Sequence, residues 1–235
     1  MESQAFQQHH LAEKLEEVRQ RIARAARKSG RTPEEVTLVA VTKGHPVTVV
    51  DAALGLGLRD LGENRVEALE ERVPLYSQHQ LRWHMVGRLQ RRKAPRLLGL
   101  CHLLHSVDSL RLAERLSRAA EEADTSLAVL AQVNVAGEDA KTGWAPAEAA
   151  DEILALAQMP GLEVKGLMTM APHTDEEAVL RESFRGLREL HEDLQAHGYP
   201  GTELSMGMSN DFEVAVEEGS TLVRLGTALF GERAR

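Results

Sequence analysis

The sequence is poor in features that would mark several classes of protein. It holds one cysteine, Cys101, among its 235 residues, so a disulfide within the chain is impossible and a reducing compartment is expected. No apolar run approaches the roughly 20 residues that cross a bilayer, and the N-terminus lacks the apolar core of a secretion signal. We therefore expect a cytoplasmic protein without a membrane span.

Positive charge is also scarce. The chain has 28 Lys and Arg residues against 36 Asp and Glu residues, a formal net charge of -8. A nucleic-acid-binding protein normally carries a net basic face, so nucleic acid is a disfavoured partner. Five basic residues form a local exception, which we interpret as a solvated helix or loop: Arg88, Arg91, Arg92, Lys93 and Arg96.

Histidines do not fall in a pattern that predicts a metal site. His9 and His10 lie in a polar terminal segment, where disorder is the simpler interpretation. His102 and His105 lie at a predicted strand, without further ligands at a spacing known for zinc. The sequence predicts no metal.

Short apolar runs rich in β-branched residues alternate with amphipathic helical patterns along the chain. Eight strands are predicted at residues 36–41, 59–62, 83–87, 103–107, 128–135, 164–169, 202–206 and 221–225. Helices are predicted at 47–56, 110–123 and 146–157, and an N-terminal helix aligns Leu11, Leu15, Val18 and Ile22 before it ends near Gly30. A capping box at 174–177 would open a further long helix that stops at Gly198.

This alternation favours parallel strands joined by helical crossovers. Eight such units with no sequence left over predict an α/β fold, a single (β/α)8 TIM barrel with an additional N-terminal helix, as one domain over residues 1–235. A doubly wound sheet is the alternative. Against it, no glycine-rich fingerprint follows the first strand, where Thr42, Lys43 and Gly44 stand instead.

Functional groups of such a barrel gather at the carboxyl ends of its strands. Lys43 closes the first strand, where desolvation would disfavour its ammonium form and leave a nucleophilic amine. A lysine whose head merely reaches solvent is the alternative interpretation.

The loops after the seventh and eighth strands form the usual phosphate site of this fold. Hydroxyls and small residues occur in both loops: Ser205, Gly207 and Ser209 in the first, Gly226 and Thr227 in the second. A helix opened by residues 210–211 would add amides that favour an anion. Ordinary turn chemistry explains each loop taken singly. Together with Lys43, the two loops indicate a phosphorylated carbonyl ligand.

Arg224 lies inside the apolar eighth strand. A buried guanidinium is costly unless it meets a polar group. Two partners are open, a carboxylate such as that of Glu63 and a pyridine nitrogen of a ligand.

Several motifs together resemble one known family. They include Leu-Val-Ala-Val-Thr-Lys43, Leu-Gly-Glu-Asn64, Ser-Met-Gly-Met-Ser209 and Val-Arg-Leu-Gly-Thr227. Further matching segments are 83–87 with 89–90, 132–134 with 141–143, 166–168 and 230–231. The sequence resembles the pyridoxal 5′-phosphate (PLP) homeostasis family, also called the YggS/PROSC family, over nearly its whole length. The barrel of that family is similar to the N-terminal domain of alanine racemase.

The resemblance implies a set of cofactor-binding residues. PLP would form a Schiff base with Lys43, and Arg224 would face the pyridine nitrogen. The phosphate would be held by Ser205, Gly226 and Thr227, with help from Ser209. Asn64, His84 and Met206 would lie near the ring. One departure is Arg92, where the family often has asparagine, and this puts the contact of that local loop in doubt.

Two functions of different classes remain open. The first is a carrier without catalytic turnover that binds PLP, limits free aldehyde and supplies apo-enzymes, as a monomer or weak dimer. The second is a small single-domain PLP-dependent racemase. An arginine cannot accept the ring-nitrogen proton, and this leaves PLP a poorer electron sink.

Alanine racemases also use arginine at the ring nitrogen, but they supply a tyrosine base from a second domain. Here the chain ends soon after the eighth predicted strand, so no such domain is expected. The only tyrosines are Tyr76 and Tyr199, and neither ends a predicted strand. We therefore favour the carrier, and we expect no enzyme activity. A Schiff-base aldolase acting on a phosphosugar is a third hypothesis, and it predicts a colourless protein.

Overall fold

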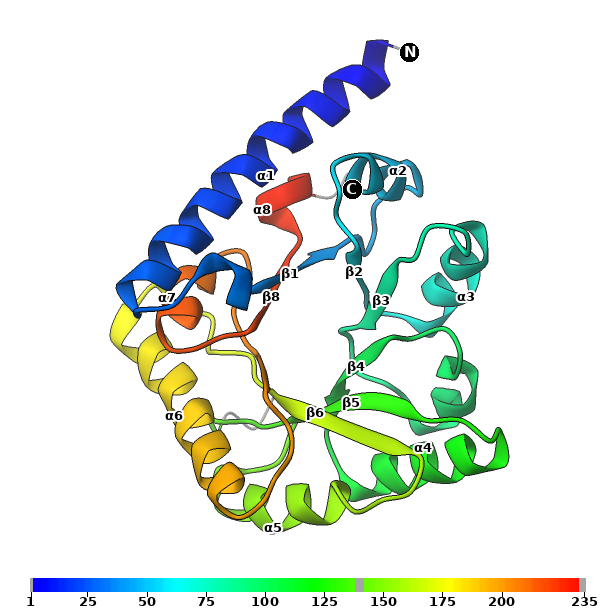
Figure 1. Cartoon of the computed structure of the whole chain (residues 1–235), viewed down its shortest axis with the longest axis vertical. Coiled ribbons are helices and arrows are strands. Elements are labelled where there is room, and N and C mark those ends of the chain that lie inside the picture. The colour runs from blue at the N-terminus through cyan, green and yellow to red at the C-terminus, as the bar shows by residue number, and fades with distance from the viewer. Residues whose placement is uncertain (1, 138–141, 233–235) are drawn as a thin grey trace.

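The chain forms a closed barrel of eight parallel strands (Figure 1). The computed structural model describes residues 2–137 and 142–232. The strands are β1 (Thr37–Val41), β2 (Asp60–Glu63), β3 (Arg82–Met85), β4 (Leu103–Val107), β5 (Leu127–Gln132), β6 (Leu162–Met168), β7 (Glu203–Ser205) and β8 (Leu222–Leu225). Each strand pairs with its neighbours in chain order, and β8 pairs with β1.

Helices connect the strands and cover the outside of the barrel. They are α1 (Glu2–Lys28), α2 (Thr48–Gly55), α3 (Val66–Leu75), α4 (Leu110–Glu122), α5 (Pro146–Leu156), α6 (Glu177–Ala196), α7 (Phe212–Glu217) and α8 (Thr227–Phe230). Two segments are 3-10 helices, η1 (Pro33–Glu35) and η2 (Arg91–Leu97). The crossover between β3 and β4 therefore uses η2 in place of an α-helix. Pro95 inside it lacks the N–H that a longer helix would need.

The predicted barrel is confirmed, and each predicted strand overlaps an observed one. The largest boundary difference is at the fifth strand, predicted to 135, which ends at Gln132. Beyond it, Val133 forms only an isolated bridge with Trp144.

The predicted capping box is wrong. The helix α6 begins at Glu177 with Glu176 as its N-cap. The Thr174 hydroxyl accepts the N–H of Glu176 at 3.1 Å, which is a local turn. Glu177 itself accepts a hydrogen bond from Arg181, at 2.6 Å.

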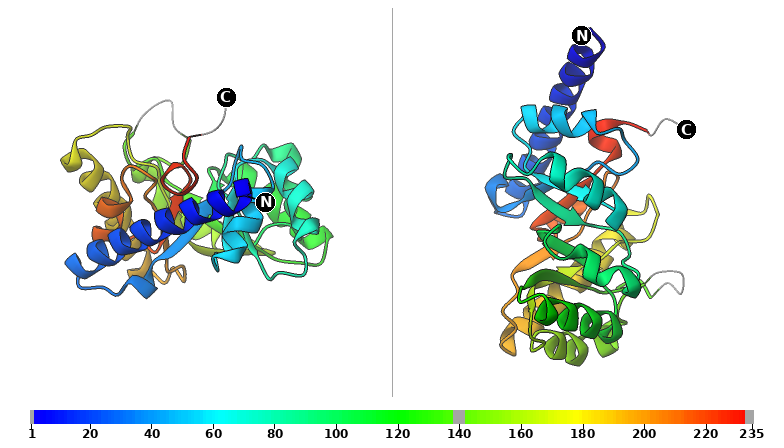
Figure 2. Two further views of the ribbon diagram at one scale, coloured as in Figure 1. Left: turned by 90° about the horizontal axis from the view of Figure 1, so that it is seen from above. Right: turned by 90° about the vertical axis from the view of Figure 1, so that its right-hand side faces the viewer.

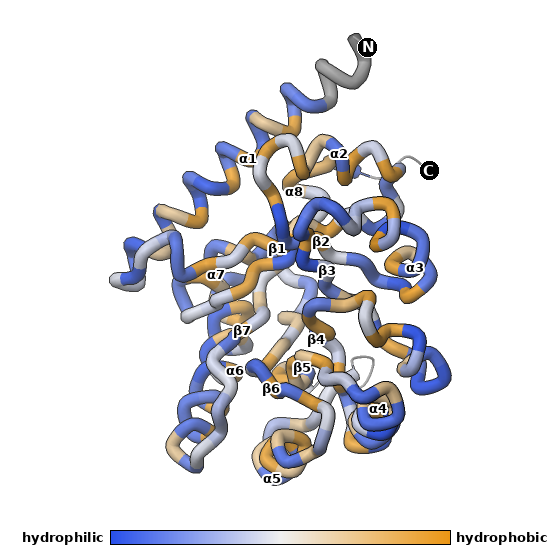
Figure 3. Tube along the Cα trace, turned by 45° about the vertical axis from the view of Figure 1, so that its right-hand side comes forward, coloured by the Kyte–Doolittle hydropathy of each residue, from blue (hydrophilic) through white to orange (hydrophobic). Residues whose placement is uncertain are grey.

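The N-terminal helix takes the place of a final barrel helix. Because α8 has only four residues, it covers little of the adjoining strands. α1 packs against α7, α8 and α2 instead, and the blue and red ends of the chain lie side by side (Figures 1 and 2). Apolar and polar residues alternate along α1 (Figure 3), and its buried face comprises the predicted Leu11, Leu15, Val18 and Ile22. Arg21 pairs with Glu213 of α7 at 2.7 Å.

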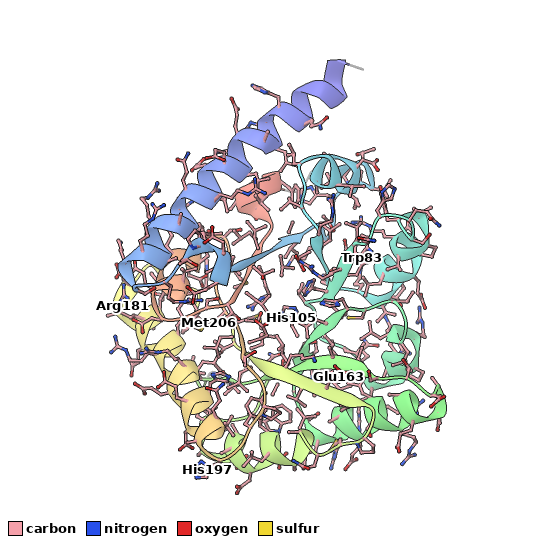
Figure 4. All side chains as sticks on the ribbon, in the orientation of Figure 1. Trp83, His105, Glu163, Arg181, His197 and Met206 are labelled. Carbon is pink, nitrogen blue, oxygen red and sulfur yellow. The ribbon has the colours of Figure 1, made fainter. Side chains whose placement is uncertain are left out.

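The interior of the barrel is partly polar. Its apolar residues form a small cluster of Val39, Leu103, Leu130, Met168 and Leu222. Buried polar residues also lie inside the barrel, and His105 is near its middle (Figure 4). A barrel interior is normally filled by branched apolar side chains. The hydrogen bonds that these buried polar groups make are therefore described with the candidate site below.

The described residues include neither a membrane-spanning helix nor a metal-binding cluster. No helix within 2–137 and 142–232 is long and apolar enough to cross a membrane. In the same ranges, no group of three or more His, Cys, Asp or Glu side chains is arranged to hold a metal ion.

Candidate functional site at the carboxyl end of the barrel

A pocket of about 460 Å³ opens where the strands end, on the face that carries the active sites of this fold. The ends of β1 and β8 and the loops after β6 and β7 form its walls. Five of the nine predicted site residues line it: Lys43, Ser209, Arg224, Gly226 and Thr227. The structure therefore brings the predicted amine, guanidinium and phosphate loops to one cavity.

Lys43 is positioned by a buried network on the outer side of its strand. Arg72 of α3 donates to Glu63 at 2.5 Å and to the carbonyl oxygen of His45 at 2.6 Å. A weaker bond of 3.3 Å reaches the carbonyl oxygen of Thr42, whose hydroxyl donates to Glu63 at 2.5 Å. The backbone is thus held on both sides of Lys43, which fixes where its side chain enters the pocket.

Arg224 does not use Glu63 as its partner. Its Nη1 donates to the Ser205 hydroxyl at 2.5 Å, and its Nη2 donates to the carbonyl oxygen of Thr169 at 2.9 Å. Burial lowers the pKa of Arg224 to about 10, although the Asp211 carboxylate acts in the opposite direction. A guanidinium has five N–H donors, so a buried Arg224 at the floor of the pocket is a strong hydrogen-bond donor to a ligand.

A chain of buried polar groups continues from Arg224 through the barrel. The Ser205 hydroxyl lies 2.8 Å from Nδ1 of His105, and Nε2 of His105 lies 2.9 Å from Nδ1 of His84. Nε2 of His84 then lies 3.0 Å from Oδ1 of Asp60. Arg82 donates to the same Asp60 oxygen at 2.6 Å. Asp60, His84 and Arg82 line a second cavity, of about 360 Å³, at the opposite end of the barrel.

Hydrogen-bond chemistry gives this chain a direction. Arginine only donates and an ionised aspartate only accepts. With both histidines neutral, Ser205 donates to His105, His105 donates to His84, and His84 donates to Asp60. Burial, with the charges around it, keeps the pKa of His105 well below its ordinary value, which favours this neutral form. Every member of the chain is then satisfied.

The loop after β7 brings Ser209 to the start of α8. The backbone N–H of Ala228 donates to the Ser209 hydroxyl at 3.1 Å. Gly207 has φ +95°, and a Cβ there would lie 2.7 Å from the Cβ of Ala215, so the turn requires glycine. The predicted helix after residues 210–211 is α7, with Asp211 as its N-cap. Ser209, Gly226 and Thr227 are thereby gathered at one edge of the pocket.

The other four predicted residues lie outside the pocket lining. Ser205 is fully buried beneath Arg224, and His84 lies deeper in the barrel. Met206 is buried in the core between strands and helices (Figure 4). Asn64 is half-buried just past β2. Its backbone packs closely against Gly87, because a Cβ added to Gly87 would lie 2.4 Å from the Asn64 carbonyl oxygen. Lys141, from a motif of the family, lies outside the described residues.

Three functional positions were missed in the sequence. His105 could have been identified from the sequence. It lies two residues after Leu103 in β4, so both side chains point to the same, inward face of the strand. Arg72 and Asp60 carried none, because each looks like an ordinary surface charge until its partner on a distant segment is known. Met170, Pro172 and His173 also line the pocket, from the loop after β6.

The chain is similar to known proteins over nearly its whole length. The model of the family described as alanine racemase, N-terminal domain, matches residues 14–234. The pyridoxal phosphate homeostasis protein of Aquifex aeolicus is 39% identical over 225 residues, which cover 95% of this chain and 99% of that protein. Its counterpart in Pseudomonas aeruginosa is 42% identical over 225 residues, covering 95% of this chain and 96% of the relative.

Solved structures give the same picture. PipY of Synechococcus elongatus with PLP bound has a TM-score of 0.81 and 36% identity, covering 94% of this chain and 100% of PipY. An unknown protein from Bifidobacterium adolescentis has a TM-score of 0.89 and 35% identity, covering 95% of this chain and 96% of that one. Alanine racemase of Clostridium difficile, at 17% identity and a TM-score of 0.76, shares the barrel fold, and the match covers 58% of the racemase.

Proposed function

Since the chain belongs to the family of pyridoxal phosphate homeostasis proteins, we propose that it binds PLP at the carboxyl end of its barrel. Its work there is to hold and release the cofactor, without catalytic turnover of its own. The observation that carries this proposal is the single pocket shared by Lys43, Arg224 and the phosphate loops.

The residues present fit the cofactor. A cavity of about 460 Å³ lies within the usual range of small-molecule sites. Ser209, Gly226 and Thr227 supply a hydroxyl-rich edge for the phosphate, next to the first turn of α8. Arg224 faces the pocket as a hydrogen-bond donor for the ring nitrogen. We assign Ser205 a supporting role, because its hydroxyl is bonded to Arg224 and His105.

Lys43 is the residue that would bond the aldehyde. Its amine condenses with an aldehyde carbon by forming a C=N bond and releasing one water molecule, so no oxidant or reductant is needed. The bonds from Arg72 to the carbonyl oxygens of Thr42 and His45 hold the backbone on both sides of Lys43, which fixes where its side chain begins. Reversal by water would release the cofactor unchanged, as a carrier requires.

The same pocket is poorly suited to racemisation. Bound PLP supplies an electron sink that works best when its ring nitrogen is protonated, and Arg224 cannot accept that proton. Racemisation also needs a second base, opposite the lysine. Neither Tyr76 nor Tyr199 lines the pocket: the Tyr76 hydroxyl donates to Asp51 at 2.7 Å, and Tyr199 is buried elsewhere in the core.

We propose that PLP-dependent apo-enzymes of the cytoplasm receive the cofactor.

Covalent trapping tests the proposal. Purified protein should be yellow, and borohydride should fix the cofactor to the peptide that contains Lys43. The variant Lys43→Ala should lose both the colour and the fixed mass. Lys165→Ala is the matched control, because Lys165 is exposed and paired with Glu163 at 2.8 Å. A Lys43→Ala protein that is still labelled as fully as the control would disprove the site.

A further inference from the structure

Another pocket, separate from the Lys43 pocket and from the cavity of Asp60 and His84, is lined almost wholly by arginine. It measures about 300 Å³ and lies between η2 and α4. Five arginines and one glutamate form its wall: Arg91, Arg92, Arg111, Arg115 and Arg118, with Glu114. None of these residues lines the pocket of Lys43.

These arginines differ from their basic neighbours in lacking acidic partners. Lys93 pairs with Glu67 at 2.7 Å, Arg96 pairs with Glu70, and Arg88 pairs with Asp108 at 3.4 Å. Within the part of the chain that the structure describes, none of the five pocket arginines forms an ion pair. Their one side-chain hydrogen bond there runs from Arg92 to Gln90, at 3.1 Å.

The helix α4 places three of them on one face. Arg111, Arg115 and Arg118 follow one another at spacings of four and three residues, which align on a helix surface. This arrangement opposes the helix dipole, since Arg111 stands in the first turn and Glu121 and Glu122 in the last. The positions of these charges are therefore not explained by the helix dipole, and the five arginines at the pocket repel one another.

A bound anion would offset this repulsion. A chain with net charge -8 has many carboxylates that might have neutralised this pocket, yet the pocket keeps one glutamate against five guanidinium groups. Guanidinium forks bind phosphate oxygens in pairs and hold them more strongly than neutral donors do. A single phosphate is too small to meet five of them, whereas linked phosphates can.

The shape of the pocket decides between a small ligand and a polymer. Its volume lies at the lower end of the range for small-molecule sites. A nucleic-acid-binding face would instead extend as a basic track along the surface, and here the neighbouring basic residues are neutralised by Glu67, Glu70 and Asp108. We propose that this pocket is a binding site for a small anion with two or three linked phosphate groups.

Titration of the PLP-loaded protein with tripolyphosphate tests the proposal. We expect saturable binding that weakens as salt is added and is much tighter than that of orthophosphate. The double variant Arg115→Gln, Arg118→Gln should lower the affinity at least about tenfold for each arginine removed. Arg24→Gln is the matched control, because Arg24 is exposed on α1 and lies outside the pocket. Thermal unfolding of each variant verifies that it is folded.

Four results would overturn the proposal. The first is a wild-type protein that does not bind tripolyphosphate, or binds orthophosphate equally well. The second is equal affinity in the double variant and the Arg24→Gln control. The third is tighter binding of a single-stranded oligonucleotide that is abolished by the same double variant, which would mark a nucleic-acid surface. The fourth is loss of tripolyphosphate binding in Thr227→Val, which would place the anion site in the Lys43 pocket. That outcome would refute the arginine site without contradicting the proposal that the Lys43 pocket binds PLP.

Discussion

The imidazole rings of His84 and His105 are hydrogen-bonded to each other inside the barrel, with 2.9 Å between Nδ1 and Nε2 and an angle of 66° between the rings. Such a bond needs a lone pair on one of the nitrogens, so the two rings cannot both be protonated. The pair connects Arg224 at one end of the barrel with Asp60 at the other. One continuous series of hydrogen bonds therefore joins the two ends of the barrel.

Removing His105 should destabilise the protein. The variant His105→Leu leaves the Ser205 hydroxyl and His84 Nδ1 without their central partner, and each buried group left unsatisfied costs about 1–3 kcal/mol. Urea unfolding would measure the loss. His79→Leu is the control, because His79 is exposed, and surface changes of this kind usually stay within about 0.5 kcal/mol. Equal stabilities for the two variants would contradict a structural role of the chain.

Stability should fall on acidification below about pH 6.5. The pKa of His105 is well below its ordinary value in the folded protein because the residue is buried. The unfolded chain therefore binds a proton more readily, and the contribution of His105 is complete above the unfolded pKa and is lost as pH falls beneath it. Burial acts on His191 in the same direction.

A histidine that stays neutral in the folded protein contributes at most about 1.4 kcal/mol per pH unit below its unfolded pKa. Unfolding measured from pH 7.5 to 5.5 should show a shallower pH slope for His105→Gln than for the wild type. Parallel slopes would exclude His105 as a source of the acid sensitivity.

Arg72 should matter for PLP binding although it does not line the pocket. The variant Arg72→Ala leaves Glu63 buried without its cation, which typically costs about 3–5 kcal/mol of stability. It also frees the backbone on both sides of Lys43. We expect weaker PLP binding and slower covalent linkage.

A second variant separates the two effects. Arg72→Met combined with Glu63→Gln removes both charges, so it should recover much of the stability but not the rate of linkage. Full recovery of both would contradict the positioning role. Arg65→Ala, at an exposed position on the same side of the barrel, is the control.

The phosphate loops should distinguish PLP from pyridoxal. Hydrogen bonds to charged groups contribute about 1.5–3 kcal/mol each, so pyridoxal should bind the wild type at least about tenfold more weakly than PLP. Ser209→Ala should reduce the ratio of the pyridoxal Kd to the PLP Kd, and it should leave the pyridoxal Kd unchanged. Thr125→Ala removes an exposed hydroxyl far from the pocket and should leave the ratio unchanged. Equal affinities for pyridoxal and PLP in the wild type would refute the phosphate site.

Amino acids should not be turned over at an enzymatic rate. General acid–base groups contribute about 10²–10⁴-fold each, and neither Tyr76 nor Tyr199 lines the described pocket to act as the second base of a racemase. Loss of optical activity and release of keto acid would be followed with each common L-amino acid. A rate in the usual enzyme range of about 1–10³ per second, abolished by Lys43→Ala, would establish a small racemase or transaminase. His173 would then be the first residue to test as its base, because it lines the pocket.

Much of this architecture could be predicted from the sequence, because the periodicity of apolar residues in strands and helices is a local property. The apolar runs predicted all eight strands, and the fold rule for carboxyl ends then singled out Lys43 and Ser209. The depth of Ser205 in the barrel could not be predicted in this way. Its distance from the rim depends on where β7 ends, and the fully buried Ser205 is the last residue of that strand.

The buried networks were beyond prediction for a different reason. Whether Arg224 meets Glu63 or Ser205 depends on which face of β2 carries Glu63, and a shift of one residue exchanges the faces. Glu63 points outward to Arg72 of α3, while Asp60 ends the chain of histidines. Pairs of this kind join segments far apart in sequence, and no local pattern marks them.

The position of α1 has a consequence for synthesis on the ribosome. This helix is translated before every strand of the barrel, whereas its packing partners α7 and α8 follow β7 and β8. At about 5–20 residues per second, some 200 residues of delay correspond to roughly 10–40 s. During that time the face of Leu11, Leu15 and Val18 has no finished surface to cover it. The nascent chain therefore keeps this apolar face uncovered until α7 and α8 are made, and the barrel closes only when β8 pairs with β1.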